Sequence, residues 1–596
     1  MRAEICRAAR LGALLAVAAC DGRPRSIGRS VTGGDEPSFG PAIAVFDLAD
    51  GVPEQVPSGW LGLSSRGTSL EDFVRQVELV EGQKDVRGVL VRLGTAHVGL
   101  GRAAEVGAAL AAVGTKHPVW CYADDYGNSS LLLAARGCTR IWAPPASSVD
   151  AVGLAAQTVY FHKLLTDELG LEVDFLQVGK FKGAEEPFTR DGPSDEARES
   201  LVSTLADLRA AWLEGIQSAR PALVESVAES GPYTAQEAKD RGLIDDVGYF
   251  DDARTALEKS TGAVRAEVRL GDGATSGGAD EWIETLRAFA GESVTSAPVV
   301  VVRATGAISM DGGGILGGGD GIVGRRLLGT LARLERDEDV RAIVFRIDSP
   351  GGSALASDLL WHALMRLRAR KTLVVSIGDM AASGGYYLAS TGAVVFADET
   401  SIVGSIGVVG GKIAADRAFE KIGMHAETFA AKRDDPHAAS RAASDSLFVP
   451  WDPETRARML DTMTGIYQLF LTRVSEGRAI PVERVAASAE GRIFSGREGK
   501  RRGLVDEIGG LRDAVARARS AAGLGRDARV GVAGESSGIL RLLGDNESRA
   551  PAARGPTGLS RFAGPLADAA PFIESLGLLT ERESLACALP YFLAVR

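Results

Sequence analysis

Residues 372–390, Thr-Leu-Val-Val-Ser-Ile-Gly-Asp-Met-Ala-Ala-Ser-Gly-Gly-Tyr-Tyr-Leu-Ala-Ser, decide our prediction of the fold. Residues 372–377 are apolar and β-branched, which predicts a short buried strand. Gly378 and Asp379 interrupt this run, and residues 381–390 then predict a helix that begins with small residues. Ser383 therefore lies at a turn between a strand and a helix.

The turn at Ser383 suits a nucleophilic serine. Gly384 and Gly385 follow it and allow a second backbone to approach closely. The N–H groups at a helix start also favour a developing negative charge. The alternative is an ordinary helix start, in which Ser383 is only a cap and the glycines only pack. This segment alone leaves both interpretations open.

A second strand with a glycine pair lies upstream. Residues 340–347 are mostly apolar, and residues 348–353, Asp-Ser-Pro-Gly-Gly-Ser, follow them. A Gly-Gly pair after a strand can offer free backbone N–H groups as an oxyanion hole. Together with the turn at Ser383, this segment points to acyl-transfer chemistry.

Three motifs occur in order: residues 348–353, residues 380–387 (Met-Ala-Ala-Ser-Gly-Gly-Tyr-Tyr) and residues 404–408 (Gly-Ser-Ile-Gly-Val). This series resembles the signal peptide peptidase A (protease IV) family, in its long form with two repeats, over about residues 40–520. The resemblance implies a ClpP/crotonase-like fold and a Ser–Lys protease without cofactor or metal. It also implies apolar signal peptides as substrates and a homotetramer.

A serine hydroxyl needs a nearby base, and no histidine occurs in a motif near Ser383. A lysine can serve if burial lowers its pKa enough to leave it neutral near pH 7. Residues 178–188 resemble the lysine segment of the long family members, which implies Lys182 as the general base. The corresponding segment of the second half contains Lys432. Single-repeat members take both groups from one domain, so Lys432 is the alternative base.

The resemblance also implies supporting roles. Ser405 matches a family serine that hydrogen-bonds the lysine amine, although Val403 stands where the family usually has threonine. Backbone N–H groups of Gly384 and of Gly351 or Gly352 would bind the oxyanion, and we favour Gly352.

The chain contains an internal repeat. Residues 85–93 match residues 339–347, and residues 233–248 match residues 494–509. Both halves alternate short apolar strands with amphipathic helices. This pattern predicts an α/β fold of two tandem repeats, with mostly parallel sheets and flanking helices.

The two halves of the repeat differ at the position of the proposed nucleophile. The alignment places Asn128 opposite Ser383, so the first half lacks the serine. We therefore expect each half to supply one part of the site, Lys182 from the first and Ser383 from the second. The two groups would then meet at an interface between the repeats.

The N-terminus predicts a lipoprotein. Three arginines precede the apolar residues 11–19, which are too few to span a bilayer. Residues 17–20, Val-Ala-Ala-Cys, resemble a bacterial lipobox, with cleavage before Cys20 and a lipid on its thiol. Such a lipid would tether the protein to a membrane. With Asp21 next, we expect the inner membrane and the periplasmic side; an ordinary signal peptide is the alternative.

These observations predict six segments, since 596 residues exceed what one core usually holds. In order they are a signal peptide (1–19), a tether (20–40), a first peptidase-like repeat that supplies the lysine (41–262), a linker (263–297), a second repeat that supplies the serine (298–522) and a tail of unknown function (523–596).

Composition narrows the function further. The net charge of −11 argues against general binding of nucleic acid, and the six histidines show no metal-ligand spacing. Cys121 and Cys138 could pair in an oxidising compartment, but the sequence leaves this open.

Two other functions compete with the protease. One is a crotonase-type acyl-CoA enzyme, against which the turn at Ser383 and the secretion signal argue, because acyl-CoA is cytosolic. The other is a non-catalytic envelope lipoprotein that serves as a scaffold or binds peptides. The motifs of the second half, which are intact, argue against this one.

Overall fold

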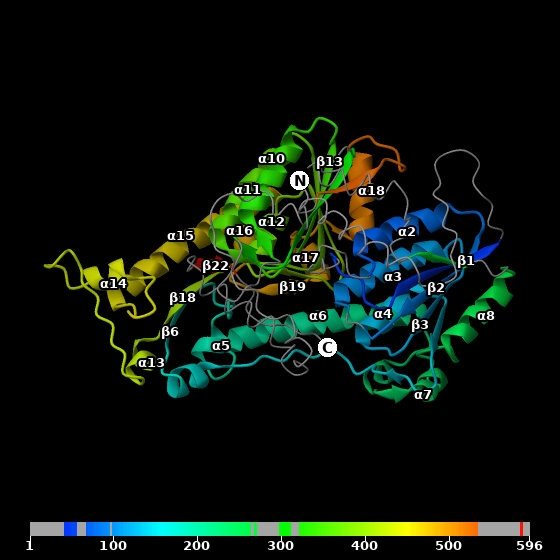
Figure 1. The fold of residues 1–596 in the computed structure, drawn as a ribbon, viewed down its shortest axis with the longest axis horizontal. Helices are drawn as coiled ribbons and strands as arrows, with labels where there is room; N and C mark the ends of the chain where they lie inside the picture. The colour runs from blue at the N-terminus through cyan, green and yellow to red at the C-terminus, as the bar shows by residue number, and fades with distance from the viewer. Residues whose placement is uncertain are drawn as a thin grey trace, which may run out of the picture.

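The computed structural model describes residues 41–55, 67–95, 98–263, 267–270, 297–311, 321–533 and 585–587. Figure 1 shows the two halves of the chain side by side, the first in blue to green and the second in green to orange. The predicted signal peptide, Cys20 and the tether lie outside the described residues. Among the described helices, none is long and apolar enough to cross a membrane.

The first repeat is built on a sheet of six parallel strands. In spatial order the strands are β8 (Asp246–Val247), β4 (Arg140–Ala143), β3 (Val119–Ala123), β2 (Val86–Leu93), β1 (Ala42–Leu48) and β9 (Glu267–Leu270). Valine, isoleucine and leucine fill its central strands, as is usual when both faces of a parallel sheet are covered.

The second repeat has the same strand order. Its six corresponding strands are β20 (Glu507–Ile508), β16 (Val394–Ala397), β15 (Thr372–Ala382), β13 (Ala342–Ser349), β10 (Val299–Thr305) and β21 (Val530–Ala533). Two further strands, β17 (Ile402–Gly404) and β19 (Ile493–Ser495), extend this sheet alongside the C-terminal end of β15. The α/β fold with mostly parallel sheets is confirmed.

Two details differ from the sequence prediction. β9 and β21 each complete a sheet, yet they lie beyond residues 262 and 522, where we expected the repeats to end. Both are four-residue edge strands and give too short a pattern to recognise. β15 does not stop at residue 377, because beyond Gly378 it pairs again with β13 and also with β17. The helix that follows, α12 (Gly384–Ala389), begins only after Ser383.

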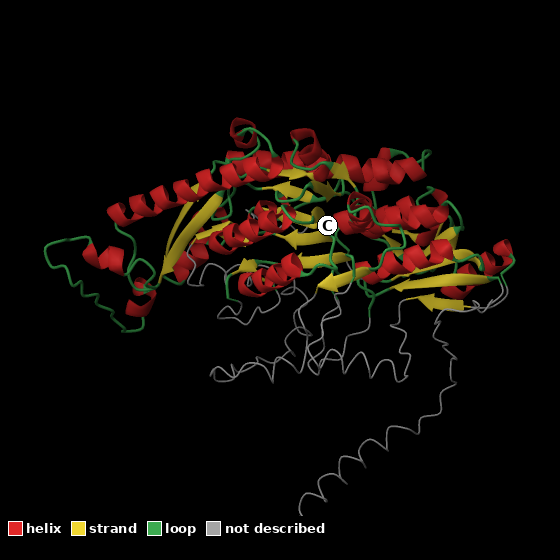
Figure 2. Ribbon diagram, turned by 90° about the horizontal axis from the view of Figure 1, so that it is seen from above, coloured by secondary structure: helices red, strands yellow, loops and turns green. Residues whose placement is uncertain are grey.

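Helices cover both faces of both sheets, and Figure 2 shows the strands between layers of helices. In the first repeat these helices include α2 (Leu70–Gly82), α3 (Leu100–Gly114), α4 (Asn128–Gly137), α7 (Ala235–Asp240) and α8 (Phe250–Thr261). In the second they include α10 (Gly324–Arg336), α11 (Ala354–Arg368), α12, α15 (Pro453–Arg478), α17 (Gly496–Arg502) and α18 (Leu511–Ala521). Residues of α2, α3 and α4 share one core with Val299 and Val344 of the second sheet. The repeats are therefore joined through a common apolar layer.

A third sheet crosses from one repeat to the other. Its strands, in spatial order, are β12 (Ile322–Val323), β11 (Ile308–Ser309), β14 (Gly352–Ser353), β22 (Leu585–Cys587), β18 (Val408–Ala414) and β6 (Glu172–Val178). β6 belongs to the first repeat and pairs antiparallel with β18 of the second over seven residues. The segment after β6 is thereby held against the second repeat.

A long helix returns the chain to the first repeat. α6 (Asp195–Ala219) spans 25 residues, roughly 37 Å at 1.5 Å per residue. The Ser194 hydroxyl caps its start, and near its other end the Trp212 indole donates a hydrogen bond to the Asn128 carbonyl. Figure 1 shows α6 running beneath both repeats. Its length lets residues 172–189 reach the second repeat.

The asparagine that stands opposite Ser383 has a structural role. Asn128 lies at the start of α4, as Ser383 lies at the start of α12. Its amide group donates a hydrogen bond to the Gly153 carbonyl and accepts one from the Val152 N–H. In the first repeat this position therefore holds a loop. The same repeat contains a disulfide between Cys121 and Cys138, which the sequence had left open.

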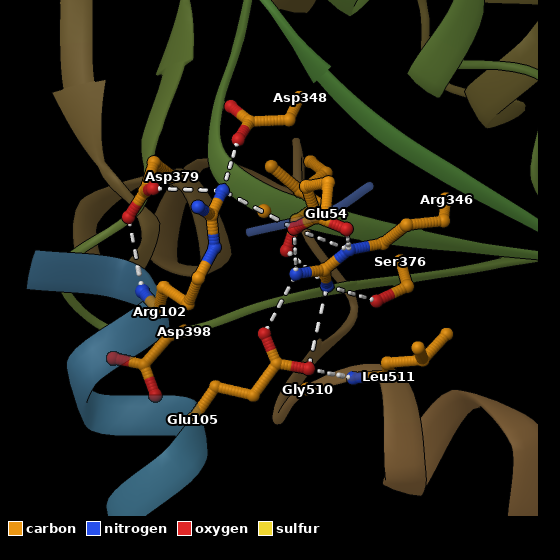
Figure 3. A network of polar contacts seen from close by, with 12 residues as sticks. Glu54, Arg102, Glu105, Arg346, Asp348, Ser376, Asp379, Asp398, Gly510 and Leu511 are labelled. Carbon is orange, nitrogen blue, oxygen red and sulfur yellow. Dashed lines mark hydrogen bonds and ion pairs between the residues drawn. The ribbon is translucent and has the colours of Figure 1, made fainter. Parts of the chain in front are cut away.

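Buried charges also join the repeats (Figure 3). The Arg346 guanidinium of β13 lies 2.6 Å from the Glu54 carboxylate and 2.8 Å from the Glu105 carboxylate, both of the first repeat. Burial alone would lower the pKa of Arg346, but Glu105 and Glu54 outweigh it and raise the pKa, so the guanidinium stays charged. Glu105 also accepts a hydrogen bond from the Leu511 N–H.

Replacement of Arg346 should destabilise the protein strongly. Arg346→Met leaves two carboxylates buried without their main cation, a loss of about 3–5 kcal/mol in the free energy of unfolding. Urea denaturation monitored by circular dichroism measures it. Arg366→Met is the control and should cost about 1 kcal/mol or less, because the Arg366 side chain is largely exposed and Arg370 still pairs with its partner Glu335. Equal losses in the two variants would contradict the role given to the cluster.

Candidate active site

The serine lies in a strained turn. Ser383 has φ 55° and ψ −118°, a backbone conformation that residues other than glycine rarely adopt and that costs of order 1–3 kcal/mol. Its side chain makes no capping hydrogen bond to α12, so the interpretation as a simple helix cap is wrong. Its N–H donates to the Gly404 carbonyl at 2.8 Å, and its carbonyl accepts from the Tyr387 N–H. These bonds fix the backbone of the turn at Ser383.

Lys182 of the first repeat reaches this hydroxyl. Its Nζ lies 2.7 Å from Ser383 Oγ, 2.9 Å from the Ser405 carbonyl oxygen and 3.0 Å from Ser405 Oγ. All three residues are fully buried. The structure thus brings together the three side chains that we predicted from separate parts of the chain.

The backbone beside Lys182 fits closely against the second repeat. A Cβ on Gly491 would come within 2.6 Å of the Lys182 backbone, and one on Gly407 within 3.2 Å of its Cδ. Phe181 N–H donates to the Glu490 carbonyl at 2.7 Å. Sequence reasoning missed Glu490 and Gly491, because their only signal is a Glu-Gly pair before β19, which many turns share.

The glycines of the two turns face each other. A Cβ on Gly384 would lie 3.2 Å from the Gly352 nitrogen, and one on Gly385 would lie 2.6 Å from the Ser349 carbonyl. The Gly351 N–H already donates to Ser349 Oγ at 3.1 Å, which favours Gly352 as the second donor beside Gly384. The Gly384 N–H, in the first turn of α12, has no partner within its own helix.

The alternative base lies elsewhere. The Lys432 side chain is 65% exposed and pairs with Asp435 at 3.4 Å, whereas Ser383 is fully buried. Within the described ranges, no group of three or more His, Cys, Asp or Glu side chains could hold a metal ion.

Comparison with known families agrees with this geometry. The model of peptidase family S49 matches residues 111–264 and 365–525, more than half of the chain. The chain belongs to peptidase family S49. The two matched ranges lie one in each repeat.

Individual relatives are similar over most of the chain. The chloroplastic serine protease SPPA of Arabidopsis thaliana is 30% identical over 391 residues, which cover 65% of this chain and 56% of that protein. Protease 4 of Salmonella typhi is 30% identical over 426 residues, 68% of this chain and 64% of that protein. Protease 4 of Haemophilus influenzae is 31% identical over 420 residues, which cover 67% of this chain and 64% of that protein. The S49 chain thus spans less than two thirds of each of these relatives.

A solved structure gives a more distant match. A mutant ClpP1 of Listeria monocytogenes covers 38% of this S49 chain and 99% of its own, with 14% identity and a TM-score of 0.24.

A buried carboxyl group lies close to the lysine of this S49 site. Burial, and secondarily the neighbouring Glu186, raise the pKa of Glu185 to about 8, although Lys182 acts in the opposite direction. At neutral pH Glu185 is therefore mostly protonated. A neutral carboxyl group does not stabilise the charged form of the amine.

The pKa of Glu185 predicts how stability depends on pH. The folded protein binds a proton at Glu185 up to about pH 8, whereas the unfolded chain releases it near the ordinary glutamate pKa of 4.5. The stability that this proton contributes is complete below pH 4.5 and falls as pH rises to 8, by at most about 1.4 kcal/mol per pH unit. Glu185→Gln keeps the neutral shape and removes this dependence.

We therefore expect the melting temperature of Glu185→Gln to exceed that of the wild type by more at pH 8 than at pH 5. Differential scanning calorimetry across this range measures the difference. A difference that stays constant, or that shrinks as pH rises, would show that Glu185 is ionised in the folded protein.

Proposed function

We propose that this chain is a membrane-associated serine endopeptidase with Ser383 as nucleophile and Lys182 as general base. The observation that carries the proposal is the hydrogen bond of 2.7 Å between the Lys182 amine and the Ser383 hydroxyl, both fully buried. Membership of family S49 and the similarity to proteins named as proteases support it.

The base acts in its neutral form. Burial in low dielectric favours the neutral form of an amine. The two N–H groups of a neutral amine can serve the carbonyl and hydroxyl oxygens of Ser405, which leaves the lone pair for the Ser383 proton. Ser405 thereby aims the base at the nucleophile.

The reaction is an acyl transfer in two steps. Lys182 accepts the proton of Ser383 as Oγ bonds to the carbonyl carbon of a peptide. The oxyanion that forms accepts hydrogen bonds from the Gly352 and Gly384 N–H groups. The lysine ammonium then gives its proton to the leaving amine as the C–N bond breaks. Water, deprotonated by the same lysine, attacks the acyl-enzyme and releases the acid and Ser383.

Extended peptides fit beside the proposed oxyanion turn. β22, from the C-terminal part of the chain, pairs antiparallel with β14 at Gly352 and with β18 on its other side. An extended backbone can therefore bind directly beside the proposed oxyanion donor, the way in which peptides add to open sheet edges. This supports a peptide rather than an acyl-CoA substrate. Similarity to a protein of Enterococcus faecium named as a putative signal peptide peptidase, 27% identical over 194 residues, supports apolar signal peptides as the substrate class.

We place the enzyme in the bacterial cell envelope, anchored to the inner membrane on its periplasmic side by a lipid on Cys20. The two relatives named protease 4 are among its bacterial relatives. The Cys121–Cys138 disulfide supports a compartment outside the cytosol, where disulfides persist.

An open strand position supports assembly into a ring such as the tetramer. In the first repeat β6 follows Leu169-Gly170 and pairs with β18 of the second repeat. In the second repeat residues 424–430 follow Ile422-Gly423 in the same way, but they form no strand and are mostly exposed. Residues 154–160, the counterpart of β18 in the first repeat, also form no strand and are partly exposed. One copy can therefore pair residues 424–430 with residues 154–160 of the next, a head-to-tail contact that closes a ring.

Substitution of the two proposed dyad residues should abolish activity. Ser383→Ala and Lys182→Met are expected to lower kcat/KM on a fluorogenic apolar peptide by about 10⁴-fold or more, because each removes a group that acts in the transition state. Lys432→Ala should stay within about twofold of the wild type, since its side chain is exposed. A fluorophosphonate probe should label Ser383 in the wild type and in Lys432→Ala, but not in Ser383→Ala or Lys182→Met.

The outcomes separate the alternatives. An inactive Lys432→Ala beside an active Lys182→Met would place the whole site in the second repeat. A folded wild type that neither cleaves peptides nor reacts with the probe would favour a non-catalytic lipoprotein that binds peptides.

The ring predicts a second effect. Phe429 is 83% exposed and lies on the unpaired segment 424–430. Phe429→Asp places a charge in the proposed contact, so the protein should dissociate to monomers in light scattering. Val224→Asp, at a position 62% exposed in the first repeat, is the control and should leave the mass unchanged. A monomeric wild type would refute the ring.

A further inference from the structure

The strand that carries the serine contains a bulge. β13 and β15 pair in register from Ala342 with Thr372 to Ile347 with Ile377, and the next pair is Ser349 with Ala381. Between these two pairs one residue of β13, Asp348, thus faces three of β15, residues 378–380. A bulge re-aims the strand that follows it, and here that strand leads directly to Ser383. The geometry of the bulge therefore sets where the serine lies relative to the turn after β13.

Two carboxylates lie at this bulge. Asp348 of β13 faces it and accepts a hydrogen bond from the Met380 N–H at 3.1 Å. Asp379 belongs to the bulge itself. Asp348 directly precedes the turn that contains Gly352, and Asp379 lies four residues before Ser383. Each carboxylate therefore belongs to one of the two turns of the proposed site.

Arg102 of the first repeat binds both carboxylates. Its Nη2 lies 2.6 Å from Asp348 and 3.1 Å from Asp379, and its backbone N–H donates to Asp379 at 2.9 Å. Figure 3 shows the guanidinium of Arg102, which belongs to the helix α3, between the two aspartates. The same nitrogen lies 3.3 Å from Glu54, which links it to the Arg346 cluster.

The start of α3 is shaped for this contact. A Cβ on Gly99 would come within 2.2 Å of the Asp379 carboxylate, and one on Gly101 within 3.2 Å of the Asp379 Cα. Ser401 holds the bulge from another side, because its hydroxyl donates to the Gly378 carbonyl at 2.7 Å. The bulge is thus enclosed between α3 and the loop before β17.

The cation also offsets a repulsion. Burial, and then the negative charge of Asp379, raise the pKa of Asp348 to about 7, against the opposing effect of Arg102. Without the guanidinium the pKa of Asp348 would rise further, so its carboxyl group would either take up a proton or move away from Asp379. Either change removes the link that holds the two turns together.

We propose that Arg102 is a positioning residue for the reaction: by binding Asp348 and Asp379 together it fixes the distance between the oxyanion turn and the nucleophile. The inference rests on the proposed function. It gives the first repeat a second contribution to the site besides Lys182. Arg102 acts on the spacing of the transition-state groups and does not contact the substrate.

The test compares Arg102→Met with the wild type and with Arg497→Met. The control removes a different ion pair between the repeats, that of Arg497 with Glu214 at 2.7 Å. We measure kcat and KM on a short fluorogenic apolar peptide, the rate of labelling by a fluorophosphonate, and the fraction of reactive serine. Arg102→Met should lower kcat per reactive serine and the labelling rate by about 10- to 100-fold, with KM within about threefold. Arg497→Met should stay within about twofold of the wild type in kcat per reactive serine and in the labelling rate.

Two further variants separate positioning from stability. Arg102→Lys keeps the charge but not the planar fork, and should recover part of kcat. Arg102→Met combined with Asp348→Asn removes the repulsion and keeps an acceptor for the Met380 N–H. This double variant should regain melting temperature but not kcat. If Arg102→Met does not fold, the lysine and double variants carry the test.

Results that contradict the role of Arg102 differ from results that contradict the proposed function. An unchanged kcat per reactive serine in Arg102→Met, or full recovery of kcat in the double variant, would reduce Arg102 to a structural role and overturn the inference, while the proposed function stands. A folded wild type that is inert to both peptide and probe would remove the proposed function and this inference together.

Discussion

The contact between the Lys182 amine and the Ser383 hydroxyl constrains the rest of the structure. A buried amine beside a hydroxyl is useful as a base only if its position is held without a carboxylate that would keep it charged. Here the packing comes from the second repeat, whose Gly407 and Gly491 leave room for the lysine and its backbone. The pairing of β6 with β18 and the length of α6 follow from the same need, since the lysine must cross from one repeat to the other.

The interface between the repeats therefore has to be specific as well as stable. Apolar packing joins the layers, but it is not directional and would tolerate small shifts. Buried ion pairs are costly to desolvate and add little net stability. When one partner moves away, however, the other charge stays buried without compensation, which destabilises the fold strongly. Arg346 with Glu54 and Glu105 behaves in this way, and Arg102 extends the same network to the two turns of the site.

The two repeats have the same strand order but have diverged in what they hold at equivalent places. The position of Ser383 is taken in the first repeat by Asn128, whose amide forms two hydrogen bonds to the loop at residues 152–153. In the second repeat the loop that corresponds to the lysine segment is exposed and carries Lys432 on the surface. Each repeat thus supplies one residue of the proposed dyad. At the place of the other residue, the first repeat has a structural asparagine and the second has an exposed loop.

The sequence by itself determined the α/β class, the internal repeat and the turns that carry Ser383 and the glycine pair, because these depend on local patterns of strands, glycines and apolar residues. The alignment of the repeats, with the family resemblance, was also enough to favour Lys182 over Lys432. The bulge in β15, the four-residue strands β9 and β21 and the packing of Gly491 on the lysine needed the structure. So did the binding of Asp348 and Asp379 by Arg102. These features depend on contacts between residues 30 or more positions apart or on strands too short to show a period, and no local pattern in the chain encodes them.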